Sequence, residues 1–172
     1  MLESNLYLNS QETVLNGKLT INKDEFVSQE KIDEAMAVVN SLDFKLQTKK
    51  MVEYNGLDKD YVLKCFVQYK NFLGMKIAYK GIKINFVPNS MIDEAWHQHI
   101  LDTEKYSEDC QMLFGEFLHH YPYSGLRGKK DVENWKEVSQ MTSKVYEHHF
   151  KNKIYDKDGG VGRGCSSQGC WC

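Results

Sequence analysis

The sequence predicts a mainly α-helical domain with a small N-terminal β-hairpin and a flexible C-terminal tail rich in glycine and cysteine. Apolar residues recur at three- and four-residue spacing in several segments, which is the period of an amphipathic helix. An Asn-Gly pair stands between two short apolar runs near the start, and the composition changes abruptly after residue 155. We therefore expect one helical domain over residues 1–155, followed by a tail over residues 156–172.

The first element expected is the hairpin, with Asn16–Gly17 as its turn in "ETVLNGKLTIN". Ser28 is a candidate N-cap for a helix over residues 29–42, because Ser at this position accepts a hydrogen bond from a free backbone N–H. A second helix is expected over residues 45–54, and Gly56 stands where glycine commonly ends a helix.

Asp58 is the expected N-cap of a longer helix, whose apolar positions are Val62, Cys65, Phe66, Tyr69 and Leu73. Residues 81–87 alternate in polarity and predict an extended connector that ends at Pro88. Ser90, with Asp93 three residues later, resembles a capping box that opens the next helix.

Asp102 is the expected N-cap of a helix that runs to about residue 119. Pro122 and the glycines between residues 125 and 128 predict a loop. A final helix is expected over about residues 130–153, with one face formed by Trp135, Val138, Thr142, Val145 and His149.

Composition argues against several classes of protein. The 172 residues carry a formal net charge of −2 and no long basic block, so we expect no nucleic-acid-binding groove. No run approaches 18 apolar residues, and the first residues lack the pattern of a secretory signal. We therefore expect no transmembrane segment, and a cytoplasmic protein whose five cysteines are reduced thiols.

The stretch "DEAWHQHILD", residues 93–102, holds the main candidate site. Asp93 and His97 are four residues apart, so on a helix they share a face and are able to chelate one ion. His99 lies about 200° around the helix from His97. It faces Asp102 and Tyr106 instead, where a carboxylate would orient the imidazole.

An antiparallel arrangement of the helices before and after residue 102 would bring His97 close to Asp109 and Cys110. The predicted ligands are therefore Asp93, His97 and Asp109, with His99 as a further ligand or as a hydrogen-bonded support. Nitrogen and carboxylate ligands suit a divalent ion, zinc first and iron or manganese next. Three protein ligands with an open position would support metal-assisted hydrolysis.

Structural alternatives to a metal site stay open. The stretch lacks the HExxH spacing of a metalloprotease, and Trp96, His97 and Tyr106 would equally suit a buried aromatic cluster. Cys110 beside His97 would form a nucleophilic dyad, or be a small core residue. His119 and His120 are interpreted as residues at the end of a helix, where imidazolium favours the helix dipole. Cys110, Tyr106 and His119 are kept as secondary candidates for the metal site.

The tail holds Cys165, Cys170 and Cys172 in a C-x4-C-x-C pattern. Three thiolates on a glycine-rich backbone would bind a soft metal or exchange disulfides, and the alternative is an unstructured tail with free thiols. The chain is then a metal-binding helical module, or a non-catalytic adaptor whose tail binds a protein partner.

The segment from residue 86 to about 126 resembles the glycine-rich domain-containing protein family, a domain of unknown function. The family pattern P-S-x-x-V-D-x-x-W-H-x-H-I-L-D-x-x-x-Y-x-x-D-C matches here at Pro88, Ile92, Asp93, Trp96, His97, His99, Ile100, Leu101, Asp102, Tyr106, Asp109 and Cys110. The resemblance implies that Asp93, His97, His99 and Asp109 act as a unit. It also accounts for the tail, since many relatives end in glycine- and cysteine-rich sequence.

Overall fold

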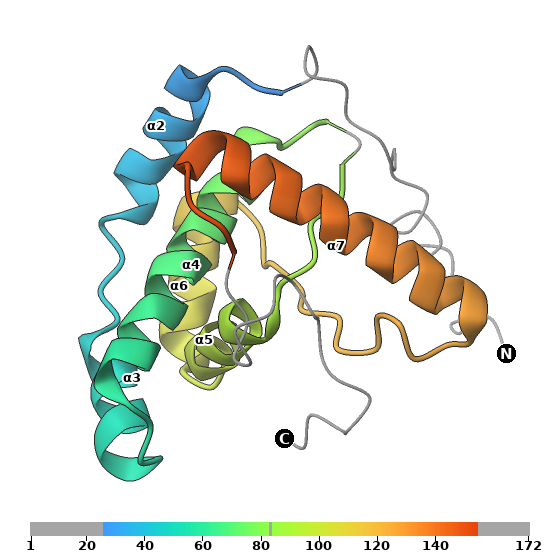
Figure 1. Cartoon of the computed structure of the whole chain (residues 1–172). Coiled ribbons are helices and arrows are strands. Elements are labelled where there is room, and N and C mark those ends of the chain that lie inside the picture. Colours follow the sequence, from blue (N-terminus) through green and yellow to red (C-terminus); the bar gives the residue numbers. More distant parts are fainter. Residues whose placement is uncertain (1–25, 83, 155–172) are drawn as a thin grey trace, which may run out of the picture.

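A computed structural model describes residues 26–82 and 84–154 of the chain (Figure 1), and these residues form helices joined by irregular segments, without a strand among them. The helices are α2 (Gln29–Val39), α3 (Lys45–Lys49), the π-helix η2 (Lys50–Tyr54), α4 (Lys59–Ala78), α5 (Ser90–Ile100), α6 (Thr103–Phe114) and α7 (Lys129–Phe150). The mainly helical prediction is thus confirmed. The predicted hairpin at Asn16–Gly17 and the predicted tail lie outside the described residues.

Side-chain caps start three of the helices. Ser28 Oγ accepts from Lys31 N–H at 3.4 Å, and Asp58 Oδ1 accepts from Tyr61 N–H at 2.8 Å, so both predicted caps are confirmed. The cap of α5 is Asn89, not Ser90. The Asn89 carbonyl already accepts the first helical bond, from Asp93 N–H, and its side chain accepts from Ile92 N–H at 2.8 Å.

The predicted second helix has two parts. It starts as the short helix α3 and widens into η2, where Asn55 N–H donates to the carbonyl of Lys50 at 3.1 Å. Gly56 follows with φ of +69°, a conformation that costs glycine little.

Helix α4 lies at the centre of the fold (Figure 1), packed against α2, α5 and α7. A helix with buried residues on several faces belongs in the interior of a domain. Gly74 permits the close approach of α2, because a Cβ at this position would lie 2.5 Å from Sδ of Met36. The buried residues of α4 are Val62, Cys65, Phe66, Gln68, Tyr69, Phe72, Leu73, Gly74, Met75 and Ala78.

Helices α5 and α6 form a hairpin with a turn at Leu101 and Asp102. Asp102 is at the N-cap position, but its side chain makes no cap bond and accepts from Gln47 Nε2 at 3.0 Å instead. Helix α6 ends at Phe114, so the prediction that it runs to about residue 119 is wrong. Gly115, with φ of +70°, caps the helix in the left-handed region and turns the chain. We call residues 115–120 the return segment.

Helix α7 buries most of its predicted face, namely Val138, Thr142, Val145 and His149, whereas Trp135 is only partly buried. His149 ties the end of α7 to two other helices. Its Nε2 lies 2.8 Å from the Tyr79 hydroxyl, and its Nδ1 lies 3.4 Å from Oε1 of Gln29. Because the hydroxyl donates to Nε2, the arrangement fits a neutral imidazole with its proton on Nδ1.

The described residues contain no helix that is both long enough and apolar enough to cross a membrane.

Candidate metal site

A carboxylate and an imidazole come together on one turn of α5. Asp93 and His97 are one turn apart, and Asp93 Oδ2 lies 3.8 Å from His97 Nδ1. Both side chains are partly buried, with 15% of Asp93 and 29% of His97 exposed. The helical spacing predicted this pair, and it occupies a position that solvent still reaches.

A second imidazole approaches from the return segment. His120 Nε2 lies 2.7 Å from Oδ1 of Asp93, a hydrogen-bond distance, so the two carboxylate oxygens face two different histidines, and an ion held here would take the place of the proton between Nε2 and Oδ1. The His120 ring lies edge-on to Trp96, with 4.6 Å between ring centroids, and only 9% of its side chain is exposed. Packing against the indole fixes the ring where its nitrogen meets Asp93.

The three side chains bring potential ligand atoms close together. One ligand atom from each of Asp93, His97 and His120 can be chosen so that all lie within 4.8 Å of one another. Tetrahedral bonds of about 2.0–2.1 Å place neighbouring ligand atoms about 3.3 Å apart. The separations of 2.7 Å from Oδ1 of Asp93 to His120 and of 3.8 Å from Oδ2 to His97 lie on either side of that value, but they involve different oxygens, so the carboxylate would have to turn to share one ion.

His99 and Asp109 lie in a separate, buried network. His99 Nε2 is 2.9 Å from Oδ2 of Asp109, and its Nδ1 is 3.0 Å from the Tyr69 hydroxyl. Because a carboxylate only accepts, the proton sits on Nε2, and Nδ1 accepts from Tyr69. Both ring nitrogens are therefore in use, and Asp109, expected beside His97, contacts His99 instead.

Burial keeps His99 neutral. Only 1% of its side chain is exposed, and burial lowers the pKa of His99 to about 4 although Asp109 favours the charged form. Lys105 Nζ lies 2.7 Å from the same carboxylate oxygen and balances the charge of Asp109. This network is internally satisfied, so its contacts explain His99 and Asp109 without an ion.

Trp96 and Tyr106 hold the return segment in place. Trp96 Nε1 donates to the Tyr106 hydroxyl at 2.8 Å, and that hydroxyl donates to the backbone carbonyl of Leu118. Burial raises the pKa of Tyr106, so its hydroxyl stays protonated and able to donate. Two residues beyond Leu118, His120 reaches Asp93, so this chain of bonds positions the second imidazole.

The chain matches the model of one protein family over most of its length. The model of the UCP032817-like family matches residues 28–149, most of the chain and every residue of the cluster. The chain belongs to the UCP032817-like family. No curated protein and no solved structure matches it significantly.

The name of the UCP032817-like family states no activity. The resemblance to the glycine-rich domain-containing family stays a prediction, which this match does not test.

Two other residues that the sequence suggested, Cys110 and His119, lie outside the cluster of Asp93, His97 and His120 in this UCP032817-like chain. Cys110 is buried in the core, and His119 is exposed with its ring beside Phe117. Cys165, Cys170 and Cys172 lie outside the described residues.

His120 was not among the candidate ligands expected from the sequence, because it was interpreted as a residue at a helix end. The sequence signal for a different interpretation is Gly115, which ends α6 and makes the following residues an irregular segment, although it does not say where that segment leads. A glycine followed by "EFLHHYP" predicts a helix stop, and the two histidines then belong to an irregular segment.

Proposed function

We propose that this protein is a divalent-metal-binding helical module whose ligands are Asp93, His97 and His120. The observation that carries the proposal is the convergence of one carboxylate and two imidazoles from two separate segments. Two nitrogens and one carboxylate suit zinc, which we expect first, and also iron or manganese. His99 and Asp109, included in the set expected from the sequence, are replaced by His120.

The arrangement supports a catalytic rather than a closed site. Three protein ligands leave at least one coordination position for an exchangeable molecule, whereas structural zinc sites have four. The 29% exposure of His97 gives that position access from solvent. A metal-bound water at this position would have a lowered pKa, and metal-assisted hydrolysis is the reaction class we expect.

Metal content tests the ligand set. Full-length protein, purified without tag or chelator, should contain about one equivalent of metal by elemental mass spectrometry, and His120→Ala should reduce it at least tenfold. His119→Ala is the matched control, because this neighbouring histidine is exposed and outside the cluster. The control should retain the wild-type content.

Equal metal content in the two histidine variants would refute His120 as a ligand. A full-length variant with Cys165, Cys170 and Cys172 changed to serine separates the helical site from the thiols. Loss of metal in that variant, but not in His120→Ala, would place the ion on the cysteines. Cobalt substitution gives a second readout, since thiolate ligands add a charge-transfer absorption that nitrogen and oxygen ligands lack.

A non-catalytic adaptor is the second candidate function. It is favoured by the hydrogen bonds of Trp96 and Tyr106, which give two prominent residues of the motif a structural role. Wild-type protein that holds no metal, and binds none on titration with zinc, would support this candidate. Deletion of residues 157–172 should then remove partner binding without a change in Tm.

A further inference from the structure

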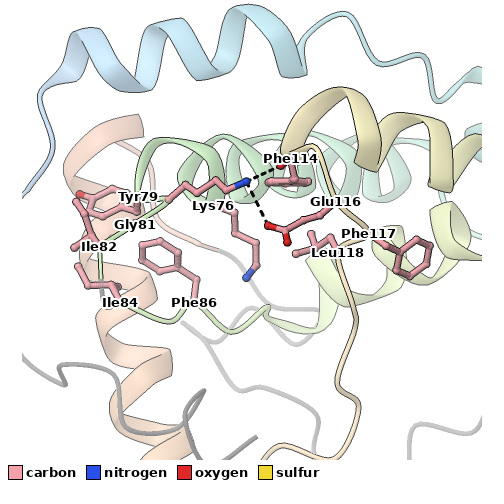
Figure 2. A pocket seen from close by; sticks show the side chains of 11 residues that line it. Lys76, Tyr79, Gly81, Ile82, Ile84, Phe86, Phe114, Glu116, Phe117 and Leu118 are labelled. Carbon is pink, nitrogen blue, oxygen red and sulfur yellow. Dashed lines mark hydrogen bonds and ion pairs between the residues drawn. The ribbon is translucent and has the colours of Figure 1, made fainter. Parts of the chain in front are cut away.

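A pocket of about 240 Å³ lies where the end of α4 meets the first residues of the return segment. His120 stands at the other end of that segment. The end of α4, the connector after it, and Phe114 to Leu118 form its walls (Figure 2). Most of the lining is apolar, with Ile82, Ile84, Phe86, Phe114, Phe117 and Leu118. None of these residues belongs to the proposed metal site.

Lys76 brings a cationic group into this apolar space. In Figure 2 its side chain extends from α4 into the space between Phe86 and Leu118. Its Nζ lies 5.4 Å from the centroid of the Phe72 ring, a cation–π contact that offsets part of its desolvation. Within residues 26–82 and 84–154, no carboxylate forms an ion pair with Lys76.

The carboxylate in the described lining is already paired with another lysine. Oε1 of Glu116 lies 3.3 Å from Nζ of Lys80, which also donates to the carbonyl of Phe114 (Figure 2). The charges of Glu116 and Lys80 therefore cancel locally. The charge of Lys76 remains, so the described lining of the pocket carries a net positive charge.

Burial among apolar groups makes this charge costly. Desolvation lowers the pKa of Lys76 to about 8. An ammonium in such surroundings gains free energy when a carboxylate replaces the lost water, because charge-assisted hydrogen bonds are the strongest of their kind. The lining thus offers one anchoring point for an anion and apolar walls for the rest of a ligand.

We propose that this pocket binds a small amphipathic organic acid, whose carboxylate pairs with Lys76 Nζ while its hydrocarbon part packs against Phe86, Ile84 and Leu118. The volume is below the range of pockets that hold drug-sized molecules, so the ligand is a short-chain or single-ring acid. Octanoate has this size and chemistry and is the probe we choose.

Calorimetric titration of the full-length protein with octanoate tests the proposal. Chelator is present throughout, so that a carboxylate–metal contact at Asp93, His97 and His120 cannot contribute. Wild type should bind one octanoate, and octylamine should not compete, because its charge is reversed. Lys76→Met should weaken binding at least about tenfold, the value of one charge-assisted hydrogen bond.

Lys64→Met is the matched control, because it removes the same charge from an exposed position on the same helix. It should bind octanoate like wild type. Equal affinity of folded Lys76→Met and wild type, or an absence of octanoate binding at millimolar concentrations, would overturn the proposal.

NMR chemical shifts of wild type give a second test that does not depend on the folding of a variant. Octanoate should perturb the amides of Phe86 and Leu118 before those of other regions. Perturbations confined to another part of the chain would also overturn the proposal.

Discussion

At the scale of single residues, His97 and His99 show how two positions along a helix separate two roles. The 100° rotation per residue puts His97 beside Asp93 on a face that solvent reaches, and turns His99 inward to Tyr69 and Asp109. Both ring nitrogens of His99 form hydrogen bonds. The other imidazole, that of His97, lies 3.8 Å from one oxygen of Asp93 and is partly exposed.

The two aspartates should differ in what they do to metal content. Asp93→Asn should lose most of the bound metal, because an amide is a poor substitute for a carboxylate ligand. Asp109→Asn should retain the metal but lower the free energy of unfolding by about 1–3 kcal/mol, since it weakens buried bonds to His99 and Lys105. Elemental mass spectrometry and urea unfolding measure the two effects.

The opposite pattern, with metal lost in Asp109→Asn and kept in Asp93→Asn, would refute Asp93 as a ligand and assign Asp109 to the metal instead. The Asp93–His97 pair could be predicted because helical periodicity alone places them together. The addition of His120 could not, because it depends on where a loop returns 27 residues away.

At the scale of elements, the length of α6 decides where the second imidazole lies. Gly115 stops the helix in a conformation that is strained for any residue with a Cβ. A continuous helix to residue 119 would carry the following histidine away from Asp93. The sequence offered both possibilities, since "FGEFLHH" satisfies a helical pattern if its glycine is ignored.

Gly115→Ala should lower the free energy of unfolding by about 1 kcal/mol and should also weaken metal binding. Gly56→Ala is the matched control. Gly56 follows η2, has nearly the same φ, +69° against +70°, and neither added Cβ would meet another atom within 4 Å. Both variants carry the same strain, but only one displaces the return segment. Zinc affinity reduced equally in both would contradict this role of Gly115.

At the scale of the whole molecule, the end of α7 is joined to the start of α2 and the end of α4. The Tyr79 hydroxyl contacts His149 and also accepts from Val27 N–H at 3.3 Å. Burial, with the charges of His148 and Lys151, lowers the pKa of His149 to about 4, and Asp33 opposes this. The neutral His149 imidazole therefore links the end of α7 to the start of α2 and to the end of α4.

Stability should therefore fall in acid. The folded pKa of His149 is below its ordinary value of 6.5, so the unfolded chain takes up a proton first as the pH falls. The contribution is complete above about pH 6.5 and is lost toward pH 4, at a cost of about 2 kcal/mol after allowance for solvent screening. Urea unfolding at several pH values measures this slope.

His149→Gln should flatten that slope relative to wild type, although it lowers stability at pH 7. Parallel pH curves for the two proteins would rule out His149 as the source. His99 also has a lowered pKa and is present in both proteins, so the difference between the curves isolates His149.

Much of this architecture could be predicted from periodicity and caps, because Ser28 and Asp58 act through neighbours in sequence. The pocket could not be predicted. Lys76 follows a run of buried residues, and nothing in its local pattern distinguishes a solvated lysine from one whose amine enters an apolar space. Only the packing of the connector and the return segment against α4 makes that difference.

The return segment has a further consequence. Leu118, fixed through Tyr106, lines the pocket for the proposed acid, and His120 belongs to the proposed metal site two residues later. If binding of one ligand moves the return segment and changes the free energy of binding the other, the second ligand changes the binding free energy of the first by the same amount. Zinc must therefore change the affinity for octanoate by the same factor by which octanoate changes the affinity for zinc. Titrations of each ligand with and without the other measure this factor. The size of this factor measures how strongly the six residues of the return segment couple the two sites.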